Sequence, residues 1–539
     1  PHPRIPGPRD IFQPERTNSR GINLPDRRAT RDLLASMQKT VAEARSIMPL
    51  VGGEHTAGSA RQSVNPADTS QVIGGWQEAD AAAVDRAMGL AQAAQPSWDD
   101  TPAAERAGVL RKASDLFEQH APELIALCVA EGGRSIPDSL AEVREAIDFM
   151  RYYAAESERA FGPPQRLPGP TGERNVLGLR GRGVFACISP WNFPLAIFTG
   201  QVTAALAAGN AVIAKPAEQT PIVAYRAIEL LQQAGVPPGV LHFLPGDGAS
   251  VGARLVADPR IAGVAFTGST ETARSINRVL AARDGTIAVL IAETGGQNAM
   301  FVDSSALPEQ VVLDAAYSAF NSAGQRCSAL RILCLQKDIA PRVLELLKGY
   351  MEELAIGDPA RLATDVGPVI DRDAQEKLAT HVERLRGRGA KIYQCRLPAE
   401  TSGGTFFPPT VVELDNFDEL RQEIFGPVLH VVRYSATRFE ATVDAVNKLG
   451  YGLTMGLHSR IDSRARSLVR RSGAGNIYIN RNMIGAVVGV QPFGGRGLSG
   501  TGPKAGGPHY LPRFAGEYSV SDNISAVGGN ASLLSLNDD

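Results

Sequence analysis

The run GVFACI, residues 183–188, begins the part of the sequence that decides the fold. Two further apolar runs follow at residues 211–214 (AVIA) and 263–266 (GVAF), and the sequence between the runs has helical spacing of apolar residues. Short apolar strands that alternate with helices are typical of βαβ units on a buried parallel sheet. Residues 183–290 therefore predict one doubly wound α/β lobe.

A second region with the same alternation begins near residue 298. Its expected strands are residues 299–302, 330–335 and 429–432, and its expected helices are residues 308–324 and 339–354. Ala-rich helical patterns at residues 31–50 and 80–159 predict further helices that pack on this framework. The chain is thus expected to contain two doubly wound lobes.

Two regions rich in Gly or Pro lie outside these lobes. Residues 161–180 contain GPTG between short alternating stretches, which suits a protruding β-hairpin. An arm that pairs across a subunit interface is one use of such a hairpin, and a plain surface loop is the alternative. Residues 1–30 hold six prolines and little apolar periodicity, so we expect an extended or loosely packed tail that is cut from a longer chain.

The composition argues against several classes of protein. The 539 residues include 55 Lys and Arg against 57 Asp and Glu, a formal net charge of −2, and 43% of them are hydrophobic. This profile is that of a soluble globular protein, and it lacks the basic field with which proteins bind nucleic acid. No apolar run approaches the roughly 18 residues that cross a bilayer, so neither a membrane span nor export is indicated.

Cysteine and histidine usage points to the compartment and against a metal. The five cysteines are an odd number without framework spacing, which favours a reducing cytoplasm over a disulfide-stapled secreted protein. No CxxC or HExxH motif is present, and the eight histidines include no pair at ligand spacing. We therefore expect no catalytic metal.

Six short motifs contain the main candidate functional residues. In chain order they are SPWNFP at 189–194, KPAE at 215–218, FTGSTE at 266–271, IAETGG at 291–296, GQRCS at 324–328 and EIFGP at 423–427. Among them, Asn192, Glu293 and Cys327 offer an amide, a carboxylate and a thiol, and the last two residues are 34 positions apart. A thiol nucleophile with a base and an amide donor suits chemistry at a carbonyl group.

In this order, the motifs resemble those of the NAD(P)-dependent aldehyde dehydrogenase superfamily, from about residue 60 to about residue 515. The resemblance implies an aldehyde dehydrogenase fold, with a NAD-binding lobe, a catalytic lobe and a hairpin arm through which a homodimer or larger assembly forms. The implied organisation is a tail at 1–30, a NAD-binding domain at 31–160 and 181–293, a catalytic domain at 294–484, and an arm with a C-terminal tail at 161–180 and 485–539.

Cys327 is the expected nucleophile. An aldehyde donates a hydride only after a nucleophile has added to its carbonyl, and a soft thiolate is suited to that addition. The preceding Arg326 and nearby backbone N–H groups are expected to lower the pKa of the thiol. A buried inert cysteine is the alternative, which Cys128 and Cys334 fit because each lies between apolar neighbours.

The resemblance gives roles to the other two groups. The Asn192 amide and the Cys327 backbone N–H stabilise the oxyanion, and one such donor is worth about 10² to 10³ in turnover. Glu293 resembles the general base that activates water to hydrolyse the thioester. The structural alternatives are a turn residue for Asn192 and a helix-capping surface carboxylate for Glu293.

The dinucleotide site departs from the usual fingerprint. GDGASVG at 246–252 has one residue too many for GxGxxG. The resemblance instead implies that the pyrophosphate lies at the helix that follows Gly268 and is capped by Ser269. The residues expected at the cofactor are Trp191, Lys215, Glu218, Gly246, Gly268, Ser269, Glu423 and Phe425.

Within this set, Lys215 and Glu218 look like ligands of the adenosine ribose. The carboxylate of Glu218 would repel a 2′-phosphate, which favours NAD over NADP. Glu423 resembles a ligand of the nicotinamide ribose, and Phe425 is expected near the nicotinamide ring. Strand-edge residues without a ligand are the alternative for these last two.

A finer resemblance concerns the aldehyde. TGGQNAM at 294–300, SAGQRCSA at 322–329, PFGGRGLSGTGPKAGGP at 492–508 and GGNASLL at 528–534 resemble L-glutamate γ-semialdehyde (1-pyrroline-5-carboxylate) dehydrogenases, in particular the C-terminal domain of bifunctional proline utilisation A proteins. The Pro-rich start resembles the linker of those proteins, and we expect that a proline dehydrogenase domain is missing. The resemblance implies NAD-dependent oxidation of the semialdehyde to glutamate, the second step of proline catabolism.

That substrate carries an α-carboxylate and an ammonium group away from its aldehyde. The backbone N–H groups of Gly485 and Ala486, with the Ser328 hydroxyl, are expected to hold the carboxylate. Glu145, on a helix expected at 141–153, is the candidate partner of the ammonium, and a solvated helix-face charge is the alternative. The remaining expected substrate residues are Phe193 and Phe493.

Three other functions stay open at this point. Another aldehyde dehydrogenase could act on an ω-semialdehyde or an apolar aldehyde. An acylating enzyme would pass the thioester to coenzyme A, but such a design has little need of Glu293. A non-catalytic scaffold fits poorly, because both the thiol and the carboxylate are present.

Overall fold

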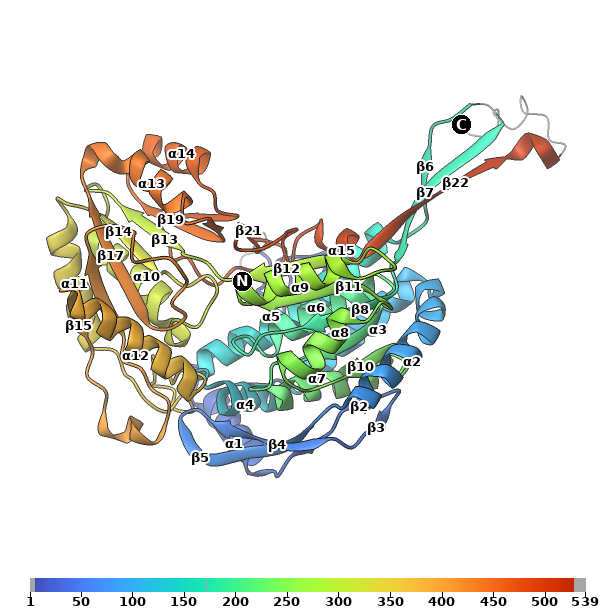
Figure 1. Ribbon diagram of the computed structural model, residues 1–539, viewed down its shortest axis with the longest axis horizontal. Helices are drawn as coiled ribbons and strands as arrows, with labels where there is room; N and C mark the ends of the chain where they lie inside the picture. Colours follow the sequence, from blue (N-terminus) through green and yellow to red (C-terminus); the bar gives the residue numbers. More distant parts are fainter. Residues whose placement is uncertain (1–4, 171, 528–539) are drawn as a thin grey trace.

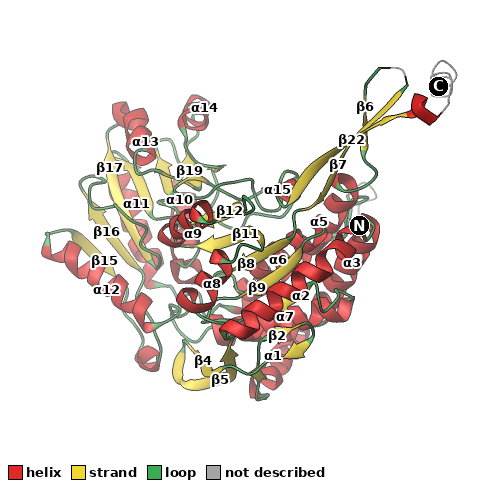
Figure 2. Cartoon of the chain, turned by 45° about the vertical axis from the view of Figure 1, so that its right-hand side comes forward, coloured by secondary structure: helices red, strands yellow, loops and turns green. Residues whose placement is uncertain are grey.

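Two lobes, each built around a seven-stranded sheet, form the body of the molecule (Figure 1). The structure is a computed structural model, and it describes residues 5–170 and 172–527. Helices pack around both sheets, as Figure 2 shows. The two doubly wound α/β lobes predicted from the sequence are both present.

The first sheet has the strand order β12-β11-β8-β9-β10-β2-β3, and it is parallel from β12 to β10. Its strands are β2 (Leu50–Val51), β3 (Glu54–His55), β8 (Val184–Ile188), β9 (Ala211–Lys215), β10 (Leu241–Phe243), β11 (Ile261–Gly268) and β12 (Val289–Thr294). The three apolar runs of the sequence form β8, β9 and β11. Because β9 and β11 lie on opposite sides of β8, the winding reverses between β8 and β11. In such sheets a ligand binds at this switch point, outside the carboxyl ends of the strands.

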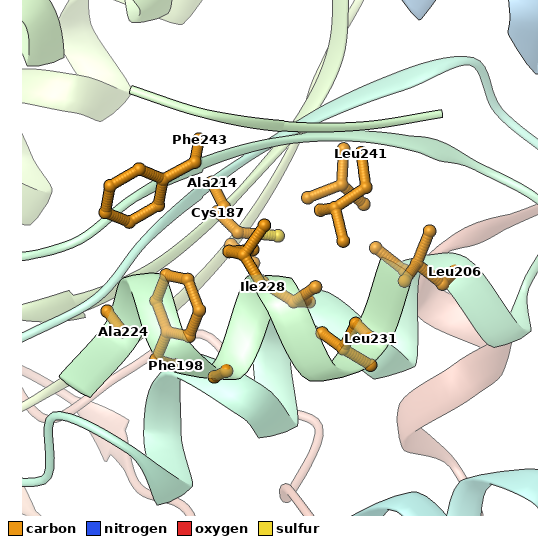
Figure 3. Close-up of a cluster of buried hydrophobic side chains, with 14 of the residues drawn as sticks. Cys187, Phe198, Leu206, Ala214, Ala224, Ile228, Leu231, Leu241 and Phe243 are labelled. Carbon is orange, nitrogen blue, oxygen red and sulfur yellow. The ribbon is translucent and has the colours of Figure 1, made fainter. Parts of the chain in front are cut away.

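Helices α6 (Ala196–Ala207) and α7 (Pro221–Ala234) pack against this sheet. Figure 3 shows Phe198 of α6 and Ile228 of α7 beside Phe243 of β10, and all three side chains are fully buried. The other helices of this lobe are α1 (Arg27–Ala42), α2 (Ala81–Asp100), α3 (Ala103–Gln119), α4 (Ala121–Gly132), α5 (Ile136–Ala160), α8 (Ala253–Ala257) and α9 (Thr270–Ala282).

The first helix is shorter than the sequence pattern predicts. Instead of reaching residue 50 it ends at Ala42, and the chain continues into short strands. Pro49 is incompatible with a helix that reaches residue 50, because proline cannot continue a helix and keeps the residue before it extended. The backbone is already extended at Glu43, the residue after the helix. A three-stranded sheet, β1-β5-β4, follows, with β1 (Ser46–Ile47), β4 (Ser59–Asn65) and β5 (Asp68–Glu78).

The second sheet has the strand order β15-β16-β17-β14-β13-β19-β20 and is parallel except between β15 and β16. Its strands are β13 (Ala299–Val302), β14 (Ile332–Gln336), β15 (Lys391–Gln394), β16 (Thr410–Leu414), β17 (Val428–Tyr434), β19 (Thr454–His458) and β20 (Asn476–Ile479). Its helices are α10 (Pro308–Phe320), α11 (Ala340–Glu352), α12 (Arg372–Gly387), α13 (Phe439–Asn447) and α14 (Asp462–Arg471). The predicted strands and helices of this region are all present.

A short connection, residues 295–298, joins the two sheets. β12 ends at Thr294 and β13 begins at Ala299, so the carboxyl edge of the first sheet meets the amino edge of the second. Loops from both edges therefore gather between the lobes.

The strands β6 (Gln165–Leu167) and β7 (Glu173–Gly181) pair antiparallel and project from the first lobe (Figures 1 and 2). β22 (Ala515–Asn523) pairs with the whole of β7. The arm therefore has a third strand from the other end of the chain, which local turn signals do not reveal. Its role at a subunit interface stays a prediction, and the motif at 528–534 lies outside the described residues. The remaining short elements are β18 (Tyr451–Gly452), β21 (Arg496–Gly497) and α15 (Tyr510–Arg513).

The N-terminal segment before α1 forms turns at residues 8–15, where most side chains are exposed. The residues that follow these turns pack on the first lobe, so the expectation of an extended or loosely packed tail does not describe them. Arg16, Asn18 and Ser19 are buried. Ser19 Oγ donates to Asp148 Oδ2 at 2.7 Å, and Arg16 Nη1 pairs with Asp148 Oδ1 at 3.1 Å. Proline content and the lack of apolar periodicity do not reveal such a polar anchor to a distant helix.

Phe198→Ala is expected to lower the free energy of unfolding by about 3–5 kcal/mol, because removal of a fully buried ring leaves a cavity beneath the first sheet. Chemical denaturation of the purified variant measures this loss. Val279→Ala, at a 37% exposed side chain of α9, is the control and should change the same quantity by less than about 0.5 kcal/mol. Equal effects of the two substitutions would contradict this account of the core.

Candidate active site

The loop that carries Cys327 lies between α10 and β14 and has an unusual backbone. Ser322, Ala323 and Gly324 have φ angles of 54°, 52° and 64°, in the left-handed region. This conformation costs roughly 1–2 kcal/mol for each non-glycine residue, so surrounding contacts must hold it. At Gly324 a side chain has no room, because a Cβ atom would lie 2.2 Å from the Gly426 carbonyl oxygen.

Asp138, near the start of α5, holds this loop. Its carboxylate accepts hydrogen bonds from Ser322 Oγ at 2.7 Å, Asn321 Nδ2 at 3.0 Å and Arg326 Nη2 at 3.0 Å. Burial raises the pKa of Asp138, but Arg326, Arg134 and these hydrogen bonds outweigh burial and hold the pKa below its ordinary value. The Arg326 guanidinium is thus directed at Asp138 and not at the neighbouring thiol.

The thiol of Cys327 is partly buried, and its pKa is raised to about 12. Burial is the main cause, the carboxylates of Glu423 and Glu293 add to it, and the Ser328 backbone N–H acts in the opposite sense. The expectation that Arg326 lowers the pKa of the thiol is wrong, because that guanidinium forms its ion pair with α5. The candidate nucleophile is therefore a neutral thiol near pH 7.

Asn192 follows β8 and reaches the same loop. Its Nδ2 donates to the Gln325 carbonyl oxygen at 3.1 Å, two residues before Cys327. The Asn192 carbonyl oxygen accepts from Arg134, whose Nε pairs with Glu142 of α5 at 2.7 Å. Because an amide nitrogen carries two hydrogens, Asn192 has a second N–H to offer beside Cys327.

Glu293 lies near the carboxyl end of β12. Its Oε2 accepts from the Gly495 backbone N–H at 3.3 Å, whereas Oε1 is buried without a hydrogen-bond partner among the described residues. Burial raises the pKa of Glu293 well above its ordinary value, and the Gly495 N–H and Lys504 offset this only in part. Glu293 also raises the pKa of Cys327, so the two side chains are close enough to interact. The helix-cap alternative does not apply, because Glu293 belongs to a strand.

Asn298 ties the end of the lobe connection to the nucleophile loop, a role that the sequence analysis missed. Its Nδ2 donates to the carbonyl oxygens of Cys327 at 2.6 Å and Ala329 at 2.9 Å. Its Oδ1 accepts from the Thr454 backbone N–H at 3.1 Å. An amide residue directly before the apolar strand AMFV was the available signal, because a polar side chain at that place needs buried partners.

Arg331 is a second residue that the sequence analysis missed. It is fully buried, and its guanidinium donates to the carbonyl oxygens of Gly324, Arg326 and Gly426. The same guanidinium pairs with Glu423 at 3.1 Å. An arginine within the apolar run ALRILCL was the signal, because a buried charge requires partners of this kind.

Glu423 and Phe425 come from the loop before β17. Glu423 lies directly against Gly295, where a Cβ atom would come within 1.6 Å of Glu423 Oε2. Trp191, after β8, packs edge-to-face on Phe425 with ring centroids 5.5 Å apart. The structure therefore brings these three predicted cofactor residues to the connection between the lobes.

Ser269 and Gly268 lie at the switch point of the first sheet. Gly268 ends β11, and Ser269 caps α9, its Oγ accepting from the Thr272 backbone N–H at 3.1 Å. Gly246 follows β10, and a Cβ atom there would lie 2.3 Å from a methyl group of Val251. Packing against this turn therefore suffices to require glycine at 246.

Lys215 is the last residue of β9, and Glu218 lies three residues after it. Lys215 is buried and its Nζ donates to the Pro216 carbonyl oxygen at 2.9 Å. Burial lowers the pKa of Lys215, and Glu218 acts in the opposite sense. Glu218 itself is exposed, at the carboxyl edge of the sheet.

Glu145 lies on α5 and is partly buried. Its pKa is raised to about 7, mainly by burial and then by the neighbouring Glu142. It also contributes to the raised pKa of Cys327. The alternative of a solvated helix-face charge is therefore wrong for Glu145, while its role toward a substrate stays a prediction.

The other predicted substrate residues lie in four places. Phe193 is between two cations, with the guanidinium carbons of Arg134 and Arg326 at 4.2 and 5.1 Å from its ring centroid. Ser328 is buried beside the nucleophile. Gly485 and Ala486 are in the loop that follows β20, where Gly485 has a φ of 75°. Phe493 exchanges two backbone hydrogen bonds with Ala505, at 2.9 and 2.8 Å.

Within residues 5–170 and 172–527, no three or more His, Cys, Asp and Glu side chains are grouped so as to hold a metal ion. In the same described part of the chain, every helix is too short or too polar to cross a membrane.

Comparison with known proteins defines the family. The model of the aldehyde dehydrogenase family matches residues 54–519, so the chain belongs to that family. It is 49% identical over 522 residues to the bifunctional protein PutA of Klebsiella aerogenes, which covers 95% of this chain and 39% of that protein. It is 38% identical over 487 residues to a 1-pyrroline-5-carboxylate dehydrogenase of Geobacillus thermodenitrificans, which covers 89% of this chain and 93% of that protein.

The fold is shared with solved structures. A crystal structure of a bifunctional proline utilization A protein is 51% identical and has a TM-score of 0.89, covering 98% of this chain and 50% of that chain. The aldehyde dehydrogenase fold expected from the sequence is thus confirmed. The chain spans about 39% of the length of the Klebsiella relative.

Alkylation of Cys327 by iodoacetamide is expected to accelerate about tenfold per pH unit from pH 7 to 10 without levelling off, because the raised pKa keeps the thiol protonated over that range. Glu423→Gln should speed the reaction at pH 8, since it removes the largest like-charge contribution to that pKa. Peptide mass spectrometry locates the modified cysteine.

The matched control for this experiment is Glu309→Gln, an exposed position on α10. It should leave the rate unchanged. A plateau below pH 8 in the unsubstituted protein would contradict the neutral thiol.

Proposed function

We propose that this chain oxidises L-glutamate γ-semialdehyde, the open form of 1-pyrroline-5-carboxylate, to L-glutamate with NAD. The observation that carries the proposal is the convergence of Asn192, Glu293 and Cys327 from three distant parts of the sequence onto one loop. The 38% identity to a 1-pyrroline-5-carboxylate dehydrogenase over 93% of its length supports this choice of aldehyde.

Cys327 is the nucleophile in this proposal and must first lose its proton. Glu293 is the proton acceptor, because its buried Oε1 has no hydrogen-bond partner among the described residues. Its pKa is raised, as is that of the thiol, and the smaller difference between the two pKa values favours proton transfer. The sulfur then bonds to the aldehyde carbon, and the carbonyl electron pair moves to oxygen. The second N–H of Asn192 and the Cys327 backbone N–H donate to that oxygen.

The oxyanion next drives hydride loss and leaves a thioester on Cys327. NAD, when bound, supplies the ring that accepts the hydride. Glu293 must release the proton of the thiol to solvent before hydrolysis. It then takes a proton from water, and the water oxygen attacks the thioester carbon. The carbon–sulfur bond breaks, the leaving sulfur takes the proton from Glu293, and glutamate leaves with the thiol restored.

The chain's residues fit the dinucleotide. The N-terminus of α9 lies at the switch point of the sheet, where its free N–H groups and Ser269 suit the pyrophosphate. Glu218 is exposed at the carboxyl edge and suits the ribose hydroxyls of NAD, as its charge disfavours a 2′-phosphate. Glu423, held by Arg331, suits the second ribose.

The amino-acid end of the substrate carries an ammonium group, which needs a carboxylate partner, and a carboxylate, which needs hydrogen-bond donors. Glu145 offers a carboxylate close enough to Cys327 to affect its pKa, which suits the ammonium group. The loop of Gly485 and Ala486 offers backbone N–H groups, and Ser328 offers a hydroxyl, for the carboxylate. In this proposal, Phe193 and Phe493 contact the apolar part of the substrate.

The proposal extends to assembly and location. A three-stranded arm that projects from its lobe buries little surface within its own chain, which supports a homodimer that pairs through the arm. A proline dehydrogenase domain is the proposed source of the substrate, since the bifunctional relatives are longer than this chain. Five free cysteines support a cytoplasmic location.

NADH formation is expected to be faster with glutamate γ-semialdehyde than with propanal or hexanal, by at least about tenfold in kcat/KM, because only the first fills the charged end of the pocket. Stopped-flow absorbance of NADH measures both rates. Cys327→Ala should abolish them, whereas Cys395→Ala, at a cysteine of the second lobe, should not. A preference for the aliphatic aldehydes would contradict the proposed substrate.

Glu293→Ala should give a burst of NADH close to one equivalent per active site and then slow turnover, because water activation is lost while an added base in solution still deprotonates the thiol. Steady-state turnover should fall by about 10² to 10⁴. Rapid-quench analysis should detect the acyl-enzyme on Cys327. Loss of the burst together with turnover, even at pH 10, would show that Glu293 does not serve the hydrolysis step.

A further inference from the structure

Arg16 connects two parts of the predicted substrate pocket, although it precedes residues 54–519 that the family model matches. Its Nη2 donates to the Val488 carbonyl oxygen at 2.7 Å, and its Nη1 pairs with Asp148 Oδ1 at 3.1 Å. The side chain is only 4% exposed, and its guanidinium carbon lies 3.8 Å from the centroid of the Phe12 ring. One buried cation therefore joins α5 to the loop after β20.

The loop that Arg16 contacts turns sharply around Val488. Gly485 and Gly489 have φ angles of 75° and 77°. The N–H of Gly489 donates to the Gly506 carbonyl oxygen, and those of Val490 and Gln491 donate to the Val487 carbonyl oxygen. Val488 itself is buried. The contact with Arg16 adds a side-chain anchor to this turn, two residues after Ala486.

The α5 side of the connection lies beside the other half of the pocket. Asp148 follows Glu145 by three positions, which places the two on one face of the helix. The charge of Asp148 is one of the causes that raise the pKa of Glu145. Ser19 reinforces the anchor, because its backbone N–H and its hydroxyl both donate to Asp148, at 3.0 and 2.7 Å.

We propose that Arg16 is a positioning residue for specificity, which sets the distance between Glu145 and the N–H groups of Gly485 and Ala486. These are the two groups that hold the ammonium and the carboxylate of the substrate, so the inference rests on the proposed function. Among the described residues, the Arg16 side chain contacts Asp148, Val488 and Phe12, and its hydrogen bonds do not involve Cys327, Glu293 or Asn192. It therefore acts on recognition of the amino-acid end and not on the reacting carbonyl.

Arg16→Met in the full chain tests this inference. With saturating NAD, KM for glutamate γ-semialdehyde should rise about tenfold to a hundredfold with little change in kcat, because hydrogen bonds that involve a charge are lost at the far end of the substrate. KM and kcat for propanal, which lacks that end, should change less than about twofold. Arg20→Met, at a 64% exposed arginine of the same segment, is the matched control and should change neither.

Arg16→Lys provides a second test in case the Arg16→Met protein does not fold. Lysine keeps the charge beside Asp148 but lacks the planar fork that reaches two acceptors, so the same selective rise in KM is expected, with a smaller size. Thermal melting shows whether the Arg16→Met protein is folded. If it is not, KM of the Arg16→Lys variant for the two aldehydes tests the proposal.

An equal loss with both aldehydes, or an unchanged KM for the semialdehyde, would overturn the positioning role and leave a purely structural anchor. A failure of the proposed function is distinguishable, because the unsubstituted protein would then show no preference for the semialdehyde over propanal.

Discussion

The site depends on the hydrogen bonds that the side-chain amide of Asn298 makes. Only residues 295–298 separate the edge strand of one sheet from a central strand of the other, so the two lobes must meet at this place. Asn298 fixes the end of this connection to the second lobe, because it binds the carbonyl groups of Cys327 and Ala329 and the N–H of Thr454. Glu293 lies five positions before Asn298, near the end of β12, so a short piece of backbone links the base to the residue that holds the nucleophile loop.

The charges around this frame are arranged for structure more than for activation of the thiol. Arg134, Arg326 and Arg331 each bind a carboxylate and backbone carbonyl or hydroxyl groups. The charged groups that act on the Cys327 thiol are mainly the carboxylates of Glu423 and Glu293. A thiol kept neutral in this way resists oxidation and alkylation, since the thiolate is the reactive form. The thiol of Cys327 therefore becomes reactive only when a bound substrate or cofactor changes the charges around it.

Local signals in the sequence predicted the elements well, because β8, β9, β11 and β13 are short apolar runs between turns. Contacts between distant residues could not be predicted in this way. The direction of Arg326 depends on Asp138, which lies on a helix of the other lobe, and the anchor of Arg16 depends on Asp148. Motif order predicted that Cys327, Glu293 and Asn192 come together, but the burial that raises the pKa of the thiol exists only after both lobes pack.

One segment, residues 495–523, completes both the arm and the surroundings of Glu293. β22 is the long partner of β7, and the segment around Gly500 covers the edge strand β12, with hydrogen bonds from Thr294 N–H to Ser499 and from Thr501 N–H to Ala292. Gly495, whose N–H holds Glu293, belongs to the same segment. Until residues 495–523 have docked, most strands of both sheets can form, but the arm lacks a strand and Glu293 lacks its backbone donor.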